Sequence, residues 1–461
     1  MTTIHSLALG LLAGLAFAID FAAASAAEGV PPNILLIVAD DLGWSDVGWH
    51  GGFAKTPHMD ELAATGVELD RHYVQPVCTP TRTALLTGRY PGRFGPHALA
   101  PSNRRALPPG TVTLASALKS LGYRTLLSGK WHLGSRPEWG PNEYGFDHSY
   151  GTLTGAADPW THKYRRGPHE DTWHRDGKLF DEEGNATELI AAEAVRRIEE
   201  AGGDPWFVYV PFHAVHTPVD APEKYKRLYE GVTFHADPSK QDSRLRMAAM
   251  ISQLDAKVGE LIAALERTGQ RENTLVIFTS DNGGIESLKN AYVGDVGDSP
   301  LNSENNPLRG EKNTLYEGGV RVCAFANWPG VLKPGKFTTP MHAVDWLPTI
   351  AGLIGYKPEQ DLQWDGVDQW SALSGKPRSG VERSIYIAMR DGGCALIQGD
   401  WKLIQRPRAD AELYNLADDP YEKTNLVAQY PAKVQQLQRQ LAAHRAQDDP
   451  KLPTDLEGTP E

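Results

Sequence analysis

Four polar side chains that could bind a metal ion stand just beyond two strongly apolar segments of this chain. The first pair, Asp40 and Asp41, directly follows one such segment, and the second pair, Asp281 and Asn282, comes soon after another. All four side chains offer oxygen atoms. Oxygen ligands in this number suit Ca²⁺ best, with Mg²⁺ second because it tends to keep its water molecules. An Asp after a strand is also a common turn cap, but two such pairs favour a metal site.

Cys78 begins a second group of residues that could do chemistry. Pro80 and Arg82 follow it at the second and fourth positions, and a short apolar run then leads into Thr-Gly-Arg at 87–89. The run 81–88 is predicted to be helical, so the Cys78 side chain would lie at a helix N-terminus, where the partial positive charge favours an anion. A lone cysteine is more often a small buried apolar residue, but the extended pattern argues for a function.

This pattern resembles the signature of the type I, formylglycine-dependent sulfatases, most closely the arylsulfatase and N-acetylgalactosamine-4-sulfatase-like branch of the alkaline phosphatase superfamily. The resemblance implies that a formylglycine-generating enzyme oxidises Cys78 to formylglycine. The hydrated aldehyde would attack the sulfate ester with one hydroxyl, and deprotonation of the other would then expel sulfate. Arg82, one helical turn away, is expected to hold this diol. The calcium ligands of the family match five positions of this chain: Asp40, Asp41, Cys78, Asp281 and Asn282.

Two further stretches match the same family. Residues 129–134, Gly-Lys-Trp-His-Leu-Gly, resemble its second signature. That match implies that Lys130 contacts the sulfate group and that His132 accepts a proton when sulfate is expelled. Residues 309–312, Arg-Gly-Glu-Lys, resemble a stretch in which a lysine grips the sulfate, so Lys312 is expected to do so. The third residue of this stretch is more often glycine in the family.

Two histidines lie in the segment 213–218. In the sulfatase family the histidine just before an x-Pro step protonates the leaving alcohol, and His216 matches that position. A histidine whose pKa is near its ordinary value suits a proton donor. His213 is predicted to contact the substrate or to line its pocket. Such histidine spacing could also suggest zinc, but the oxygen-only ligand set argues against that metal.

Aromatic and basic residues gather in the segment 139–173, between the matched stretches. Trp160 and Arg165 are the candidates for sugar contacts, because aromatic rings can stack on sugar faces and arginine can pair with carboxylates or further sulfates. Packing on the core is an equal alternative for any residue of this group. The resemblance implies a sulfated carbohydrate substrate, with a 4-sulfated galactosamine or galactose unit as first choice.

Two other functions are compatible with parts of the pattern. Some relatives of the sulfatases share the Cys-x-Pro-x-Arg motif and hydrolyse phosphonate or phosphate diesters. A non-catalytic protein that binds sulfated glycans would keep the basic residues but could lose the nucleophile or the metal ligands, all of which are present here. The favoured function is therefore hydrolysis of sulfate monoesters.

Four apolar runs of strand length should position these residues: 33–39, 123–127, 206–210 and 274–279. Unbroken apolar character is typical of strands buried on both faces of a parallel sheet. Amphipathic helical patterns lie between the runs, over residues 114–121, 189–201 and 245–268. The alternation predicts an α/β fold with a large, mostly parallel central sheet flanked by helices, of the alkaline phosphatase type. Because ligands bind beyond the carboxyl ends of such strands, the polar residues after all four runs should meet in one site.

The pattern changes near Asp368, which predicts a catalytic domain (27–368) and a small C-terminal α+β domain (369–461). A short antiparallel sheet and one final helix are expected in the second domain, over residues 384–388, 394–398, 401–404 and 432–447.

Composition limits the partners and the location of the chain. It has 46 Lys and Arg against 58 Asp and Glu, and the net charge of −12 argues against nucleic acid. Any sulfate site must therefore be locally positive. Residues 1–26 resemble a signal peptide, which predicts export to the periplasm or secretion, and no later apolar stretch is long enough to span a bilayer. Cys323 and Cys394 could pair, but Cys323 lies in the strand-like run 320–326 and is predicted to be a buried thiol.

Overall fold

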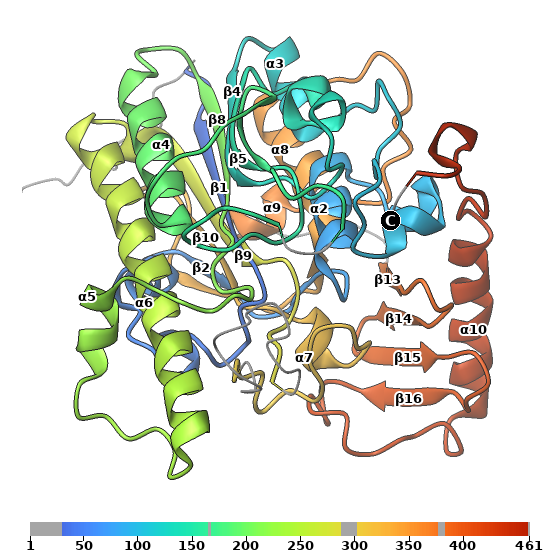
Figure 1. Cartoon of the computed structure of the whole chain (residues 1–461). Helices are drawn as coiled ribbons and strands as arrows, with labels where there is room; N and C mark the ends of the chain where they lie inside the picture. Colours follow the sequence, from blue (N-terminus) through green and yellow to red (C-terminus); the bar gives the residue numbers. More distant parts are fainter. Residues whose placement is uncertain (1–29, 165–166, 287–301, 377–382, 460–461) are drawn as a thin grey trace, which may run out of the picture.

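The computed structural model describes residues 30–164, 167–286, 302–376 and 383–459. A ten-stranded mixed sheet lies between two layers of helices, and a separate four-stranded sheet carries its own helix (Figure 1). This arrangement confirms the predicted α/β fold with a small antiparallel C-terminal sheet. No helix in the described part of the chain is both long and apolar enough to cross a membrane. The predicted signal peptide lies outside the described residues.

Five parallel strands form the centre of the large sheet, in the order β9 (Thr274–Ser280), β1 (Asn33–Ala39), β8 (Trp206–Pro211), β4 (Arg124–Lys130) and β5 (His148–Thr152). Four of them overlap the four predicted apolar runs, and β1 coincides with its run. Every residue of β1 is buried, and successive residues such as Leu36 and Ile37 pack in different core clusters on opposite faces. Burial on both faces explains the unbroken apolar sequence of this strand.

Strand β4 continues to Lys130 instead of ending at residue 127, because its last three residues still pair with β5. Gly129 lies opposite Gly151 in this pairing. A Cβ atom at Gly151 would come within 2.2 Å of the Gly129 carbonyl oxygen, so the close approach of the two strands requires glycine.

Short strands, most of them in antiparallel pairs, extend both edges of the sheet, and only β10 overlaps a predicted run. They are β10 (Ala324–Asn327), β2 (Val67–Leu69) and β11 (Gly335–Phe337) on one side, and β6 (Trp173–Arg175) and β7 (Lys178–Leu179) on the other. Strands this short show no clear two-residue periodicity. The predicted strand-like run 320–326 is only partly a strand. Its first residue is the last residue of α7 (Glu317–Val320), its last three residues lie in β10, and Cys323 comes just before that strand. All three cysteines lie in described segments, and each is free and buried.

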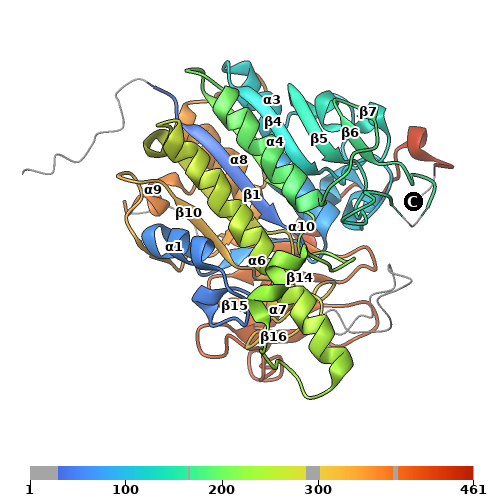
Figure 2. The same cartoon turned by 60° about the vertical axis from the view of Figure 1, so that its left-hand side comes forward.

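Helices cover both faces of the large sheet (Figure 2). One face carries α1 (Pro57–Thr65), α4 (Ala186–Glu200), α5 (Glu223–Lys226) and α6 (Pro238–Arg267). The other carries α2 (Cys78–Thr87), α3 (Leu114–Ser120), α8 (Trp346–Ile354) and α9 (Trp370–Leu373). Helix α4 starts earlier than predicted because the Asn185 side chain caps it, accepting a hydrogen bond from the Thr187 amide. Helix α6 was predicted from residue 245 but begins at Pro238, because its first turns lie in a polar segment without an amphipathic pattern.

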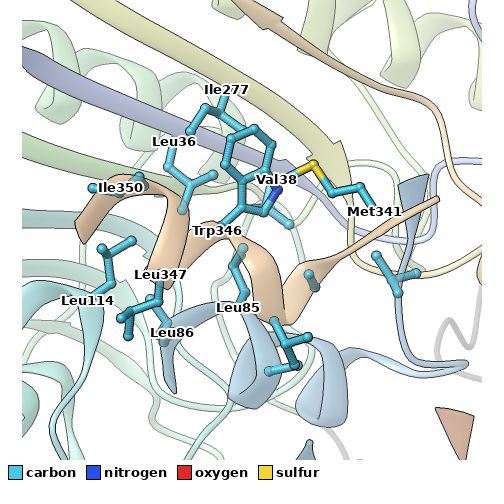
Figure 3. Close-up of a cluster of buried hydrophobic side chains, with 14 of the residues drawn as sticks. Leu36, Val38, Leu85, Leu86, Leu114, Ile277, Met341, Trp346, Leu347 and Ile350 are labelled. Carbon is cyan, nitrogen blue, oxygen red and sulfur yellow. The ribbon is translucent and has the colours of Figure 1, made fainter. Parts of the chain in front are cut away.

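Trp346 of α8 fills the layer between the sheet and α2 (Figure 3). Its ring lies beside Leu36 and Ile277 of the sheet, and Leu85 of α2 lies on its other side. The indole nitrogen donates a hydrogen bond to His72 Nε2 at 3.0 Å. His72 belongs to a two-stranded sheet of β3 (His72–Tyr73) and β12 (Met341–His342). This packing holds α2, and therefore its first residue, against the central strands.

The C-terminal sheet is an antiparallel meander of β13 (Ser384–Ala388), β14 (Cys394–Gln398), β15 (Trp401–Gln405) and β16 (Glu412–Asn415). Helix α10 (Pro431–Arg445) packs on it through Leu437 and Leu441. The strand β16 was not predicted. Lys402 of β15 is fully buried and pairs with Glu317 at 2.9 Å and Glu422 at 2.8 Å, which ties this sheet to α7.

Candidate active site

Side chains at and beyond the carboxyl ends of β1, β4, β8 and β9 converge on the first residue of α2. Asp40, Asp281 and Cys78 each contribute one potential ligand atom, and these atoms lie within 4.8 Å of one another. Asp41 and Asn282 are 241 positions apart in the chain, yet the Asn282 amide donates to Asp41 Oδ1 at 2.7 Å. The structure thus brings the five candidate metal ligands into one cluster.

Asp40 and Asp41 both face this cluster although they are neighbours in the chain. Consecutive residues of a strand point to opposite faces, but Asp41 has a φ of 62°, in the left-handed region. Within the described residues, Asp40 Oδ1, Asp41 Oδ2 and Asn282 Oδ1 are buried and have no hydrogen-bond partner. Buried polar atoms are normally satisfied, so three such oxygens fit a hard divalent cation such as Ca²⁺.

Three cations face the three carboxylates of the site. The pairs are Lys130 with Asp40 (2.5 Å), Lys312 with Asp41 (2.5 Å) and Arg82 with Asp281 (2.8 Å). Because these charges balance, a divalent cation at the site would make it positive within a protein of net charge −12. An acidic protein can therefore offer a local binding site for an anion.

The surroundings move the pKa values of two of these carboxylates in opposite directions. Burial, with the charge of Asp40 adding to it, raises the pKa of Asp281 to about 6. Burial acts in the same direction on Asp41, but the Lys312 ammonium and His216 outweigh it and lower the pKa of Asp41 to about 2. The pH dependence of cation binding should therefore come mainly from the titration of Asp281.

The Arg82 guanidinium is directed at Asp281 and Lys130. It is fully buried and donates to Asp281 Oδ2 at 3.0 and 2.8 Å and to the Lys130 carbonyl oxygen at 2.8 Å. The role of Arg82 in holding the side chain of residue 78 stays a prediction. Its hydrogen bonds orient a candidate metal ligand and link α2 to the end of β4.

Cys78 is the first residue of α2 and is almost completely buried. Burial raises the pKa of its thiol, and the charges of Lys130 and Lys312 oppose this effect. A protonated thiol is a poor nucleophile, so the unmodified side chain is not suited to attack. The neighbouring Thr79 hydroxyl donates to the His132 carbonyl oxygen at 3.0 Å, which joins the start of α2 to the loop after β4.

His132 lies against Gly155, a contact that the sequence did not reveal. A Cβ atom at Gly155 would come within 2.1 Å of His132 Nε2, so a larger residue there would displace the imidazole. Burial and the charge of Lys130 hold the pKa of His132 well below its usual value. The neutral ring is able to accept a proton. Gly155 is required because a ring from another loop packs against it, and such a requirement cannot be recognised in the local sequence.

His213 and His216 reach the site from the loop after β8. His213 Nε2 shares a hydrogen bond of 2.6 Å with the Thr152 hydroxyl. His216 Nδ1 donates to the Thr217 carbonyl oxygen at 2.6 Å, and His216 Nε2 lies 3.7 Å from Asp41 Oδ2. Burial lowers the pKa of His216 to about 3, which corrects the expectation of an ordinary pKa. The imidazole is therefore neutral even beside the Asp41 carboxylate, and further negative charge near it would raise its pKa.

The aromatic and basic segment 139–173 contains both core and surface residues. Trp173 is buried and stacks on His162 with ring centroids 4.2 Å apart, so these two rings belong to the core. Trp160 is exposed, and its indole nitrogen donates to Asp220 at 2.9 Å. Arg165 lies outside the described residues.

Comparison with known proteins agrees with this fold. Residues 32–356 match the Sulfatase family. The chain is 32% identical to mouse arylsulfatase J over 89% of its own length and 75% of that protein, and 34% identical to human arylsulfatase A over 81% and 72%. The solved structure of Ps i-CgsB in complex with k-i-k-neocarrahexaose has a TM-score of 0.80 and 30% identity, covering 91% of this chain and 94% of that one.

The fold is that of the alkaline phosphatase superfamily. The chain belongs to the sulfatase family, and it is a sulfuric ester hydrolase. These findings confirm the resemblance seen in the sequence motifs.

Proposed function

We propose that this enzyme removes sulfate from a sulfated carbohydrate with a formylglycine, made from Cys78 by a formylglycine-generating enzyme, and a bound Ca²⁺. The observation that carries the proposal is the cluster of Asp40, Asp281 and residue 78 within 4.8 Å. The proposed ligands of the cation are Asp40, Asp41, Cys78 in its modified form, Asp281 and Asn282, with Mg²⁺ as second choice. When bound, the cation would supply positive charge that stabilises a deprotonated nucleophile and the sulfate group.

The residues around this cluster are proposed to share binding and proton transfer. Lys130 and Lys312 would bind the sulfate oxygens, on which charge grows during transfer. Arg82 would keep a metal ligand in place, as partners of ligating carboxylates do. His132, which is neutral, would take a proton as sulfate leaves residue 78. His216 would donate a proton to the leaving alcohol.

The proposed substrate is a sulfated glycan met outside the cytoplasm. A signal peptide over residues 1–26 would direct the chain to the periplasm or the medium. A structural neighbour has been solved with k-i-k-neocarrahexaose bound, which supports an oligosaccharide substrate. Trp160, Arg165 and His213 are proposed to contact the sugar. A 4-sulfated galactosamine or galactose unit is our first choice.

The proposal is tested by rates on three kinds of substrate: an aryl sulfate, a phosphodiester analogue and a panel of defined sulfated oligosaccharides. We expect kcat/KM for the aryl sulfate to exceed that for the phosphodiester, and sulfate to be released from at least one sugar. Faster phosphodiester hydrolysis would favour the alternative function as a phosphonate or phosphate diester hydrolase. Binding of sulfated sugars without sulfate release would indicate a non-catalytic glycan-binding protein.

His216→Ala should slow hydrolysis of a sugar sulfate far more than that of nitrophenyl sulfate. A sugar alkoxide is a poor leaving group and needs the proton, whereas nitrophenolate hardly does. A bound sulfate ester brings negative charge next to His216, which raises the low pKa of its imidazole and allows protonation. We expect a loss of roughly 10²–10⁴-fold in kcat on the sugar and a much smaller loss on the aryl ester.

Steady-state kinetics on both substrates measures this difference. His235→Ala, which changes an exposed histidine, is the matched control and should retain both activities. Equal losses on the two substrates would show that His216 binds sulfate and does not donate the proton.

A further inference from the structure

A pocket of about 440 Å³ lies where the C-terminal sheet meets the segment leading into α2. Its volume is within the range of small-ligand sites. The lining comes from four parts of the chain and includes Pro76, Val77, Leu99, Asn313, Met389 and Arg390.

The pocket adjoins the candidate active site through two of its walls. Val77 immediately precedes Cys78, and Asn313 immediately follows Lys312. The two walls are joined because the Asn313 amide donates to the Pro76 carbonyl oxygen at 2.8 Å. Each of these two walls is therefore one residue away from a position of the candidate active site.

A third wall is the turn between β13 and β14, and Gln75 is hydrogen-bonded to the strand β13 that leads into it. Gln75 is fully buried, its amide donates to the Tyr386 carbonyl oxygen at 3.2 Å, and its Oε1 accepts from the Ala388 amide at 3.1 Å. The Thr81 hydroxyl in α2 is hydrogen-bonded to the backbone N–H and C=O groups of Gln75. The end of β13, from which the turn starts, is thus linked through Gln75 to α2.

The lining suits a sugar that carries a negative charge. Val77, Leu99 and Met389 offer apolar surface on which the face of a sugar ring can pack. Arg390 is exposed at the pocket, and a guanidinium can bind a sulfate or carboxylate through two N–H groups. The acidic residue Asp391 also lines the pocket, but one of its oxygens accepts an amide of its own turn at 2.8 Å.

We propose that this pocket is the subsite for the sugar joined to the sulfated unit, and that Arg390 selects substrates in which that sugar carries a sulfate or a carboxylate. The inference rests on the proposed function, because it assumes that a glycan chain continues from the sulfated unit. It gives the C-terminal sheet a part in substrate choice.

Kinetics on three matched oligosaccharides tests the proposal: one with a sulfate on the neighbouring sugar, one with a carboxylate there, and one with neither. Arg390→Ala should raise KM about tenfold on whichever charged substrate the subsite prefers, with a smaller effect on kcat and on the neutral substrate. Arg390→Lys should fall between, because lysine keeps the charge but loses the two-point geometry. Arg439→Ala, an exposed position of α10, is the control and should leave KM unchanged.

Equal changes in KM on charged and neutral substrates, or no change on any, would overturn the subsite. Calorimetry measures the Kd of the same oligosaccharides for Cys78→Ala protein, with and without Arg390→Ala. This comparison tests the subsite independently of turnover. If the wild-type enzyme releases no sulfate but binding still depends on Arg390, the proposed function fails and the subsite stands. If sulfate is released and binding is indifferent to Arg390, only the subsite fails.

Discussion

Asp281→Ala protein is expected to lose bound calcium and nearly all sulfatase activity. Asp281 lies within 4.8 Å of potential ligand atoms of Asp40 and Cys78 and is the ion-pair partner of Arg82. Its removal deletes one proposed ligand and leaves the Arg82 guanidinium without its ion-pair partner beside the proposed cation site. Loss of several kcal/mol of charge stabilisation by the metal corresponds to a decrease of at least about 10³-fold in kcat/KM. Metal content measured by mass spectrometry and sulfate release from an aryl sulfate check this result.

Two further variants separate loss of the cation from loss of the fold. Asp281→Asn keeps a hydrogen-bond acceptor for Arg82, so it should retain the native circular dichroism spectrum while still losing most of the metal. Asp204→Ala changes an exposed carboxylate and should keep both metal and activity. Full calcium occupancy in Asp281→Ala would contradict the assignment of this residue as a ligand.

The pH dependence of calcium binding is a second measure of the same residue. Burial and the nearby Asp40 charge raise the pKa of Asp281 to about 6 in the metal-free protein. The cation binds the ionised carboxylate, so affinity should be highest above this pKa and fall as the pH drops through it. The ionised fraction decreases about tenfold between pH 7 and pH 5, and the calcium Kd should rise by about the same factor. This dependence should be weaker in Asp281→Asn.

Active preparations should contain formylglycine at position 78, and Cys78→Ser should fold but fail to turn over. The buried thiol has a raised pKa and is a poor nucleophile. A serine hydroxyl could accept sulfate once, but it has no second hydroxyl to expel it and would remain a sulfate ester. We expect a decrease in kcat on the order of 10⁴-fold or more, as for other removed nucleophiles.

Mass spectrometry of the peptide that contains residue 78 tests both statements, because it distinguishes cysteine, formylglycine and a sulfated serine. Cys394→Ser is the matched control, since Cys394 is also buried but lies in β14 of the C-terminal sheet. It should remain active. A fully active enzyme with an unmodified thiol at position 78 would refute the proposed nucleophile.

Much of the central sheet could be predicted from local sequence. The run 33–39 coincides with β1, and the runs ending at 210 and 279 differ from β8 and β9 by one residue each. A strand buried on both faces must be apolar at every position, so its pattern is visible without knowledge of the rest of the chain. The edge strands have two to four residues, and their pairing depends on neighbours that are distant in sequence.

The sequence by itself determined which polar residues stand at the ends of the central strands, and its motifs indicated the family. The tertiary structure alone decided how these residues pair, because Lys312 meets Asp41 across 271 positions and Arg82 meets Asp281 across 199. It also decided the low pKa of His216, the burial of Trp173 and the contact between His132 and Gly155. Each of these three features depends on burial and on side chains from other elements. A local residue pattern encodes neither burial nor such contacts.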